Sequence, residues 1–338
     1  MSDDGLIIAV TGPTGTFGFG LIPLLQDDQR VARIVGIARR PFDPSEHGWS
    51  KMEYRQGDVR EPDALRTAFD RADVVVHLAF MITGAASRDT IRATNVEGTL
   101  NAFEAAAAAG AKRFVYASSV AAYGFHPDNP IGMTEDWPTR PATRLFYAQE
   151  KAELERLLRE RADAHPDVAL YVLRPPIVLG PHAVGAKDAL PLPLAAIAQQ
   201  TLDLAGRLPV PLPIPIPDLP MQFIHEDDVG QALRRCVVAA GPPGAYNIAG
   251  EGIVTAADVV RELGFTPITV PAGIAQGAAR AAASVPFPSF APPAAEWVEA
   301  ASHPAIMDTT KAKRELGWQP KYTGLDALRE TLRRKPAG

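Results

Sequence analysis

The sequence predicts an α/β fold in which a doubly wound parallel sheet is followed by a smaller C-terminal substrate lobe. Short apolar segments typical of buried strands alternate with helical patterns through the first half of the chain, which indicates parallel strands joined by crossover helices. After Pro181 the composition changes, and residues 181–220 are rich in Pro, Leu and Ala. The predicted strands span residues 6–10, 33–38, 52–56, 74–79, 113–117 and 169–174.

The domain boundaries follow from this change in composition. We expect the sheet domain to span residues 1–180 and to regain 221–249, whereas 181–220 and 250–338 form the lobe. Residues 208–220 read LPVPLPIPIPDLP, and proline at alternate positions excludes a helix. This proline strip is a structural segment packed on the body, a lid over an apolar substrate, or a contact with a subunit or membrane.

Local signals also place individual residues in helices. The alanine run 105–109 before Gly110 is typical of a helix end with a glycine stop. Thr255 is a suitable N-cap for a helix of the lobe. Cys236 is the only cysteine and lies in an apolar helical stretch, so we expect a small core residue.

A glycine-rich turn, TGPTGTFG at residues 11–18, joins the first strand to a helix that starts near Phe17. Glycines at such a joint permit a tight turn, close approach to a pyrophosphate and close packing of helix on strand. The helix N-terminus adds free N–H groups and the positive end of the helix dipole. The turn therefore predicts a dinucleotide site, with the candidates Gly12, Thr14, Gly15, Thr16, Phe17 and Gly18.

A second group predicts proton transfer. Tyr147 and Lys151 are four residues apart on a predicted helix and share one face. A free tyrosine has a pKa of about 10, and we expect the Lys151 ammonium and an oxidised nicotinamide to lower it. Tyr147 is then a general acid or base. Ser119 follows the strand 113–117 at the edge where such sheets bind ligands, so it is placed to bind the substrate oxygen, or else to cap a turn.

With these residues in place, the chain resembles the extended short-chain dehydrogenase/reductases, also called the NAD-dependent epimerase/dehydratase family. The resemblance covers nearly the whole length and implies a Rossmann fold. Its motifs, in order, are TGPTGTFG (11–18), GDVR (57–60), HLAF (77–80), NVEGT (95–99), ASSVAAYG (117–124), YAQEK (147–151), RPPIVLGP (174–181), FIHEDDV (223–229), YNIAG (246–250) and DTTKAKRELGWQP (308–320).

The resemblance implies roles for individual residues. Ser119, Tyr147 and Lys151 form the catalytic group, Lys151 also holds the nicotinamide ribose, and Asn95 supports the active site. Asp58 contacts the adenine and Ala79 forms a wall beside the cofactor. Val59, Leu78 and Pro175 complete the implied cofactor contacts. The resemblance also implies a homodimer, formed through the helices after the fourth strand and around Tyr147.

The end of the second strand bears on the choice of nucleotide. NAD enzymes place an acidic residue there for the ribose hydroxyls, but this chain has Ala38, followed by Arg39 and Arg40. The guanidinium of Arg39 is suited to pair with a 2′-phosphate. The sequence favours NADP, with NAD as the alternative and a solvated surface charge as the plain interpretation of Arg39.

The chain departs from the nucleotide-sugar epimerases it resembles. Ile177 stands where these enzymes usually have an asparagine, Met221 stands where they often have an arginine, and residues 281–307 contain no lysine or arginine. Holding a diphosphate without such partners is costly. The sequence therefore predicts an apolar pocket, although ordinary core packing explains at least half of its candidates. These are Phe80, Met81, Ile82, Phe125, Leu190, Met221 and Phe223, with His126 and His182 flanking them.

These observations predict an NADP-dependent carbonyl reductase or alcohol dehydrogenase that acts on a largely apolar small molecule. The alternatives are a nucleotide-sugar epimerase or dehydratase that retains NAD, and a cofactor-binding regulatory protein without chemistry. A net charge of −5 without a basic stripe argues against a nucleic-acid partner. A single cysteine, no signal peptide and no membrane-spanning run indicate a cytoplasmic protein. The cluster 225–228 has side chains that point in different directions, so no metal site is expected.

Overall fold

A parallel seven-stranded sheet forms the centre of the protein in the computed structural model, which describes residues 5–82, 86–143, 145–183, 213–217, 219–270 and 303–333. The strand order is β3-β2-β1-β4-β5-β6-β11, so the order reverses between β1 and β4 and the sheet is doubly wound. The strands are β1 (Leu6–Thr11), β2 (Val31–Ala38), β3 (Met52–Gln56), β4 (Val74–His77), β5 (Arg113–Ala117), β6 (Ala169–Arg174) and β11 (Gly244–Asn247).

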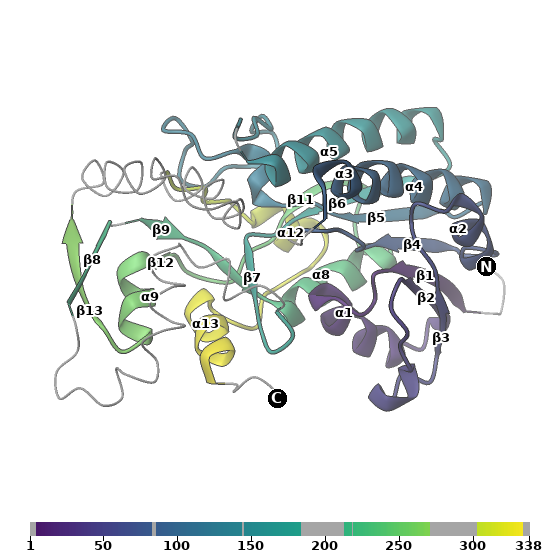
Figure 1. Cartoon of the computed structure of the whole chain (residues 1–338), viewed down its shortest axis with the longest axis horizontal. Helices are drawn as coiled ribbons and strands as arrows, with labels where there is room; N and C mark the ends of the chain where they lie inside the picture. The colour runs from purple at the N-terminus through teal and green to yellow at the C-terminus, as the bar shows by residue number, and fades with distance from the viewer. Residues whose placement is uncertain are drawn as a thin grey trace.

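Helices cover both faces of this sheet (Figure 1). One face carries α2 (Pro62–Ala68), α4 (Gly98–Ala108) and α5 (Phe146–Ala164), and the other carries α1 (Thr16–Gln26) and α8 (Glu226–Val237). Successive residues of β1 alternate between the two cores, because Ile8 and Val10 pack on the α1 side and Ala9 packs on the α5 side. Burial of both faces explains why the strands are apolar throughout.

All of the strands predicted from the sequence are present in this sheet. Within residues 221–249, α8 packs on the sheet and β11 pairs in parallel with β6. The helix end at the alanine run is confirmed, because α4 ends at Ala108 and Gly110 has a φ of 76°. Cys236 is fully buried in the α8 core, which raises the pKa of its thiol.

The smaller lobe is built from short strand pairs around its own apolar core (left in Figure 1). The pairs are β7 (Ile177–Leu179) with β10 (Phe223–His225), β9 (Pro220–Met221) with β12 (Val254–Thr255), and β8 (Pro213–Pro217) with β13 (Thr266–Val270). The lobe also contains α9 (Ala256–Glu262) and α13 (Gly324–Arg333), whereas α12 (Thr310–Glu315) packs with Ala312 against the core of the sheet domain.

The described part of the proline strip is an extended structural segment. In β8, Ile214 and Ile216 are buried in the core of the lobe, whereas Pro213 and Pro215 are exposed. The prolines therefore lie on the face and edge where a missing N–H donor costs least. Of the three interpretations of this strip, packing on the body fits residues 213–217. Residues 208–212 and Asp218 lie outside the described residues.

Thr255 caps α9 as expected, and the cap gives a test of the lobe. Its hydroxyl accepts a hydrogen bond from the Asp258 backbone N–H, and the Asp258 carboxylate accepts one from the Thr255 N–H. We expect Thr255→Ala to lower the free energy of unfolding by about 1 kcal/mol. Thr309→Ala is the matched control, because Thr309 precedes α12 without a side-chain cap bond. Urea unfolding measures the free energy of unfolding of both variants. An equal loss in the two variants would contradict the expected contribution of the Thr255 cap.

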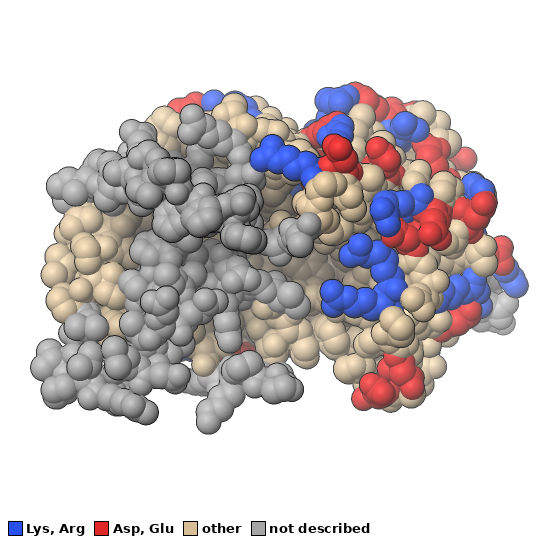
Figure 2. Space-filling view, viewed as in Figure 1, with Lys and Arg blue, Asp and Glu red and all other residues tan. Residues whose placement is uncertain are grey.

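The surface and the helices give two further observations. On the face shown in Figure 2, Lys and Arg are interspersed with Asp and Glu over the sheet domain. Along the ranges that the structure describes, no helix combines the length and the apolar character needed to cross a membrane.

Candidate active site

The glycine-rich turn lies where the strand order reverses, between the ends of β1 and β4. Gly12 has a φ of 67°, and a Cβ atom there would lie 2.9 Å from the backbone nitrogen of Ala79. Only glycine combines this left-handed conformation with so close an approach. Gly12 thus brings the segment after β4 against the turn, at the place where doubly wound sheets bind their ligands.

Gly18 and Gly15 are glycines for different reasons. A Cβ atom on Gly18 would overlap the carbonyl of Pro13, so Gly18 is required for packing of α1 on the turn. Gly15 is exposed at the N-cap of α1 with an ordinary φ of −92°, and a Cβ atom there would meet only the Gly12 oxygen, at 3.5 Å. The fold does not need a glycine at 15. A pyrophosphate lying on the N-terminus of α1 would need one, so the turn fits a dinucleotide.

The other residues of the turn connect it to its surroundings. Thr16 is the first residue of α1, and its hydroxyl donates to the carbonyl of His182 at 2.9 Å. Phe17 packs against the core between the sheet and α8, and Thr14 is half-buried beside Gly15.

A buried histidine, which the sequence analysis does not assign, holds the segment after β4. The Thr11 hydroxyl accepts hydrogen bonds from the N–H groups of Leu78 and Ala79, each at 3.2 Å. The His77 ring lies between the hydroxyls of Thr11 and Thr99, 2.9 Å from each. Burial lowers the pKa of His77 to about 3, so the ring is neutral. The motif HLAF is the signal that could have pointed to this role.

Asn95 fixes the next residues of the same segment. It lies in a single π-helical turn, Ala93–Glu97, of a kind often found at functional sites. Its side-chain oxygen accepts from the Met81 N–H at 2.7 Å, and its amide nitrogen donates to the Met81 carbonyl at 3.0 Å. The same nitrogen donates to the carboxylate of Glu150 at 2.7 Å. Asn95 therefore joins the segment after β4 to α5.

The structure brings Ser119 and Tyr147 together. Ser119 follows β5, and Tyr147 lies in the first turn of α5. The Ser119 oxygen accepts the Ala121 N–H at 3.1 Å, so the serine also caps a turn. Burial raises the pKa of Tyr147 to about 12, and a hydrogen bond with Ser119 opposes this shift. A hydroxyl pair of this kind can bind one substrate oxygen and exchange a proton with it.

Lys151 lies one helical turn below Tyr147 and is buried. Its ammonium group donates to the Ala117 carbonyl at 2.7 Å and lies 3.5 Å from the centre of the Phe80 ring. It is 5.7 Å from the centre of the Tyr147 ring. Burial lowers the pKa of Lys151 to about 7, against the attraction of Glu150 and Glu155.

The expectation that Lys151 lowers the pKa of Tyr147 is wrong for this structure. The ammonium group points at the Ala117 carbonyl and the Phe80 ring, and desolvation of the Tyr147 hydroxyl dominates. The spacing of four residues places the two side chains on one face but does not fix where the ammonium group points.

A buried ion pair supports the serine from below. Arg174 donates to both oxygens of Glu155, at 2.9 and 2.5 Å, and to the Tyr123 hydroxyl at 2.6 Å. The Ser118 hydroxyl donates to the same carboxylate at 2.6 Å. Arg174 and Glu155 are almost completely buried. The pair fixes the backbone beside Ser119, and the sequence analysis missed it because its members come from separate elements.

The region expected to receive the adenosine half has a positive character. Arg39 and Arg40 are exposed after β2, and Nη1 of Arg39 lies 3.8 Å from the Met81 sulfur. The carboxylate of Asp58 accepts three hydrogen bonds from the Arg60 guanidinium, at 2.7 to 3.1 Å. Val59 is buried beside it, and the Pro175 carbonyl accepts the Val120 N–H at 2.9 Å.

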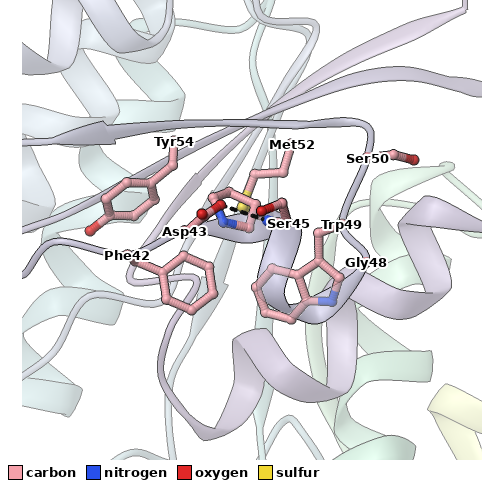
Figure 3. A pocket seen from close by; sticks show the side chains of 9 residues that line it. Phe42, Asp43, Ser45, Gly48, Trp49, Ser50, Met52 and Tyr54 are labelled. Carbon is pink, nitrogen blue, oxygen red and sulfur yellow. Dashed lines mark hydrogen bonds between the residues drawn. The ribbon is translucent and has the colours of Figure 1, made fainter.

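A cavity of about 510 Å³ is lined by the segment that connects β2 to β3 and by residues of β3, away from the catalytic group. Figure 3 shows the Phe42 and Trp49 rings, which line it, next to each other and Ser50 pointing away from the other side chains. None of Ser119, Tyr147 and Lys151 lines it. The Tyr54 hydroxyl, at one side, donates to the Ala38 carbonyl at 3.1 Å. The cavity therefore borders the end of β2 and not the reacting groups.

The apolar substrate candidates fall into two groups. Phe80 packs edge-on against Tyr147 with ring centres 5.6 Å apart, and Phe125 packs in the same cluster as Tyr147. Met81 follows Phe80, and Ile82 is exposed.

The remaining candidates lie elsewhere. Phe223 is fully buried in the core of the lobe and Met221 packs against that core, so core packing accounts for both. Phe223 is therefore wrongly assigned to the substrate pocket, because no face of its side chain is accessible. Leu190 lies outside the described residues.

The two histidine candidates have structural partners. The ring of His126 is hydrogen-bonded to the Arg140 carbonyl at 2.6 Å. His182 stacks on Phe19 with ring centres 4.2 Å apart, and its Nδ1 lies 2.6 Å from the Glu226 carboxylate. His182 thus joins α1, α8 and the segment after β7.

The acidic cluster at the start of α8 is structural. His225 accepts the Asp227 N–H and so caps α8, and Asp228 accepts the N–H groups of Lys321 and Tyr322. Within the described ranges, no group of three or more His, Cys, Asp or Glu side chains is arranged to hold a metal ion.

Residues 8–249 match the NAD dependent epimerase/dehydratase family. The chain belongs to this family. The match and the fold confirm the resemblance that the sequence motifs indicate. The solved dTDP-glucose 4,6-dehydratase from Bacillus anthracis, in complex with NAD, superposes with a TM-score of 0.70. It is 18% identical, and the superposition covers 97% of this chain and 96% of that one. At this identity the likeness shows the fold alone.

Two curated relatives are similar along the whole chain. UDP-glucose 4-epimerase from Mycolicibacterium smegmatis is 30% identical, covering 96% of this chain and 96% of its own length. An uncharacterized protein of Mycobacterium tuberculosis is 27% identical, covering 97% of this chain and 83% of its own length. The family is one of NAD-dependent enzymes. Its curated relatives also include an L-arabinose 1-dehydrogenase (NAD(P)(+)) from Haloferax volcanii, 38% identical over 33% of this chain and 40% of its own length.

Proposed function

We propose that the protein transfers a hydride between a nicotinamide dinucleotide and a substrate carbon that bears a hydroxyl or carbonyl oxygen. The single observation that carries this proposal is the Ser119–Tyr147 hydroxyl pair, which lies at the carboxyl end of β5, next to β4, with buried Lys151 on the same helix as Tyr147. When bound, the nicotinamide accepts or supplies the hydride. Ser119 orients the substrate oxygen, Tyr147 exchanges the proton with it, and Lys151 holds the ribose.

Two overall reactions use this step. In the first, the protein is a net oxidoreductase for a largely apolar molecule and exchanges its cofactor in each cycle. The position of Met221 supports it, because this residue packs against the core of the lobe where nucleotide-sugar enzymes often carry an arginine. The aromatic rings of Phe80 and Phe125 beside Tyr147 are also suited to an apolar substrate.

In the second reaction, the protein is a nucleotide-sugar epimerase or dehydratase that retains NAD, so the cofactor is oxidised and reduced within one turnover. The relatives favour this candidate more directly than the first, since a UDP-glucose 4-epimerase is similar over the whole chain. The dTDP-glucose 4,6-dehydratase whose fold is similar to that of this chain is described in complex with NAD.

Identification of the nucleotide released on denaturing the freshly purified protein distinguishes the two candidates. Mass spectrometry is expected to find either stoichiometric NAD(H), which assigns the epimerase or dehydratase reaction, or an empty site that then binds reduced dinucleotide, which assigns the net oxidoreductase. A protein that neither retains nor binds NAD(H) or NADP(H) would contradict the proposed hydride transfer.

We propose NADP as the preferred dinucleotide, because Arg39 is exposed after β2 and Ala38 stands where a carboxylate would repel a 2′-phosphate. Arg39→Ala is expected to weaken NADPH binding by about tenfold or more, the size of one hydrogen bond to a charged group, and to leave NADH binding unchanged. Calorimetric titration measures both, with Arg66→Ala on α2 as the control. Tighter binding of NADH than NADPH by the wild type would contradict the NADP preference.

The two glycines of the turn give a matched pair of variants. We expect Gly15→Ala to weaken dinucleotide binding by at least about tenfold, or about 1.4 kcal/mol, with little change in thermal stability. Gly18→Ala is expected to lower the free energy of unfolding by about 1–3 kcal/mol because its methyl group would overlap Pro13. Binding and thermal unfolding are measured for both variants. Unchanged dinucleotide binding in Gly15→Ala would contradict the proposal that the pyrophosphate binds at this turn.

A further inference from the structure

Glu150 is a buried carboxylate immediately before Lys151, and the proposed chemistry does not use it. It is 1% exposed and lies on α5 three residues after Tyr147. One carboxylate oxygen accepts the Asn95 amide at 2.7 Å, and the other is buried with no hydrogen-bond partner among the described residues. Burying a carboxylate is costly unless it is paired and hydrogen-bonded, so the place of Glu150 calls for an explanation.

The first task concerns the orientation of Asn95. Its side-chain oxygen must face the Met81 N–H, and its amide nitrogen must face the Met81 carbonyl. A rotated amide would point its oxygen at both the Met81 carbonyl and the Glu150 carboxylate, which is repulsive. Glu150 therefore strengthens the orientation that the two backbone groups of Met81 select for Asn95.

The second task concerns charge. Burial works against the charged form of Lys151, and the carboxylates of Glu150 and Glu155 attract its ammonium group. The ammonium group donates to the Ala117 carbonyl and the Tyr116 hydroxyl and lies over the Phe80 ring, and it also interacts with the buried His77 ring. Glu155 is engaged by Arg174 through two hydrogen bonds. Glu150 is acted on by Arg92, Lys151 and Glu153, and Arg92 forms its ion pair with Glu153. Glu150 is thus the carboxylate whose negative charge is least neutralised by a direct cationic partner.

We propose that Glu150 is a positioning residue, which locks the Asn95 amide onto Met81 and places a buried negative charge beside the ammonium group of Lys151. The helix α5 then carries the proton donor Tyr147, the ribose-binding Lys151 and Glu150. Through Asn95, Glu150 holds the segment after β4, and its negative charge favours the protonated form of Lys151. The charge part rests on the proposed role of Lys151 in holding the ribose, whereas the Asn95 part rests on geometry alone.

The charge part is tested by the pH dependence of NADH binding. NADH is the probe because it lacks the titrating 2′-phosphate of NADPH. If Lys151 must be protonated to hold the ribose, affinity falls above its pKa, which is about 7. Removal of a neighbouring negative charge lowers the pKa of an ammonium group. In Glu150→Gln, which keeps an oxygen for Asn95, the fall is expected to begin about one pH unit lower, so affinity above both pKa values drops about tenfold.

Glu153→Gln is the matched control, because it removes the same charge from the same helix at a partly exposed position that pairs with Arg92. It is expected to leave the profile unchanged. A Glu150→Gln profile that matches the wild type, or an equal shift in Glu153→Gln, would overturn the charge part alone. A wild-type affinity that does not vary with pH would overturn it together with the proposed role of Lys151.

The Asn95 part is tested without any cofactor. Hydrogen exchange followed by mass spectrometry reports on the Met81 amide, which is protected by the Asn95 oxygen. Glu150→Ala is expected to speed exchange of the peptide that contains Met81 by about tenfold or more, the change that loss of about 1.4 kcal/mol of protection gives. Glu150→Gln and Glu153→Ala are expected to exchange like the wild type. Unchanged exchange in Glu150→Ala would overturn the Asn95 part even if NADH binding behaves as expected.

Discussion

Replacing Tyr147 with phenylalanine is expected to reduce hydride transfer by about 10²–10⁴-fold, the usual contribution of a positioned acid or base. The change removes the hydroxyl that pairs with Ser119 but keeps the ring that packs against Phe80. Dinucleotide affinity should therefore stay within about twofold of the wild type, because Lys151 and the glycine-rich turn are untouched. The absorbance of reduced nicotinamide follows the reaction with a panel of apolar ketones. Conversion of UDP-glucose, which leaves no net change in the cofactor, is followed by chromatography of the product.

Tyr171→Phe is the control for this variant. Tyr171 lies on β6 and its hydroxyl donates to the Gly241 carbonyl, on the far side of the core from Ser119. Its loss is expected to cost a little stability and no activity. Wild-type turnover in Tyr147→Phe would contradict the proposed mechanism, whichever overall reaction the protein catalyses.

Removal of Glu155 is expected to lower the free energy of unfolding by about 3–5 kcal/mol. The substitution Glu155→Leu leaves the Arg174 guanidinium buried without its counter-ion, and an uncompensated buried charge is among the most costly defects in a protein. Chemical denaturation measures the loss. Because Ser118 also donates to this carboxylate, the variant should disturb the backbone beside Ser119 as well.

The exposed pair Arg156–Glu160 on the same helix is the matched control. Arg156→Ala should change the free energy of unfolding by less than about 0.5 kcal/mol, because exposed pairs of this spacing contribute little. The double variant Glu155→Leu with Arg174→Met should be more stable than Glu155→Leu alone, since both charges are then absent. Equal losses at the buried and exposed positions would show that the Arg174–Glu155 pair does not hold the fold.

Much of this architecture is predictable because the sheet is regular. Buried parallel strands are apolar runs of fixed length, and the residues that follow them fall on one edge of the sheet. This is why Ser119 and the glycine-rich turn could be placed from the sequence. The strand β11 was not among the predicted strands, because its short sequence GAYN contains two residues that are poor in strands.

The parts that could not be predicted depend on contacts between distant elements. Periodicity places Lys151 near Tyr147, but the direction of its ammonium group is decided by the Ala117 carbonyl and the Phe80 ring. His77 and Glu150 each make their contacts with residues from other elements, and no local pattern distinguishes them from ordinary polar residues. The sequence pattern around an apolar residue such as Phe223 is the same whether the side chain lines a pocket or packs in a core.

The most direct test of the account is a crystal structure of the protein with bound dinucleotide. The account predicts a pyrophosphate on the N-terminus of α1 beside Gly15, ribose hydroxyls within hydrogen-bond distance of the Lys151 ammonium, and a nicotinamide ring facing the Tyr147 hydroxyl. A dinucleotide bound at any other place, with Ser119 and Tyr147 remote from its nicotinamide, would contradict it.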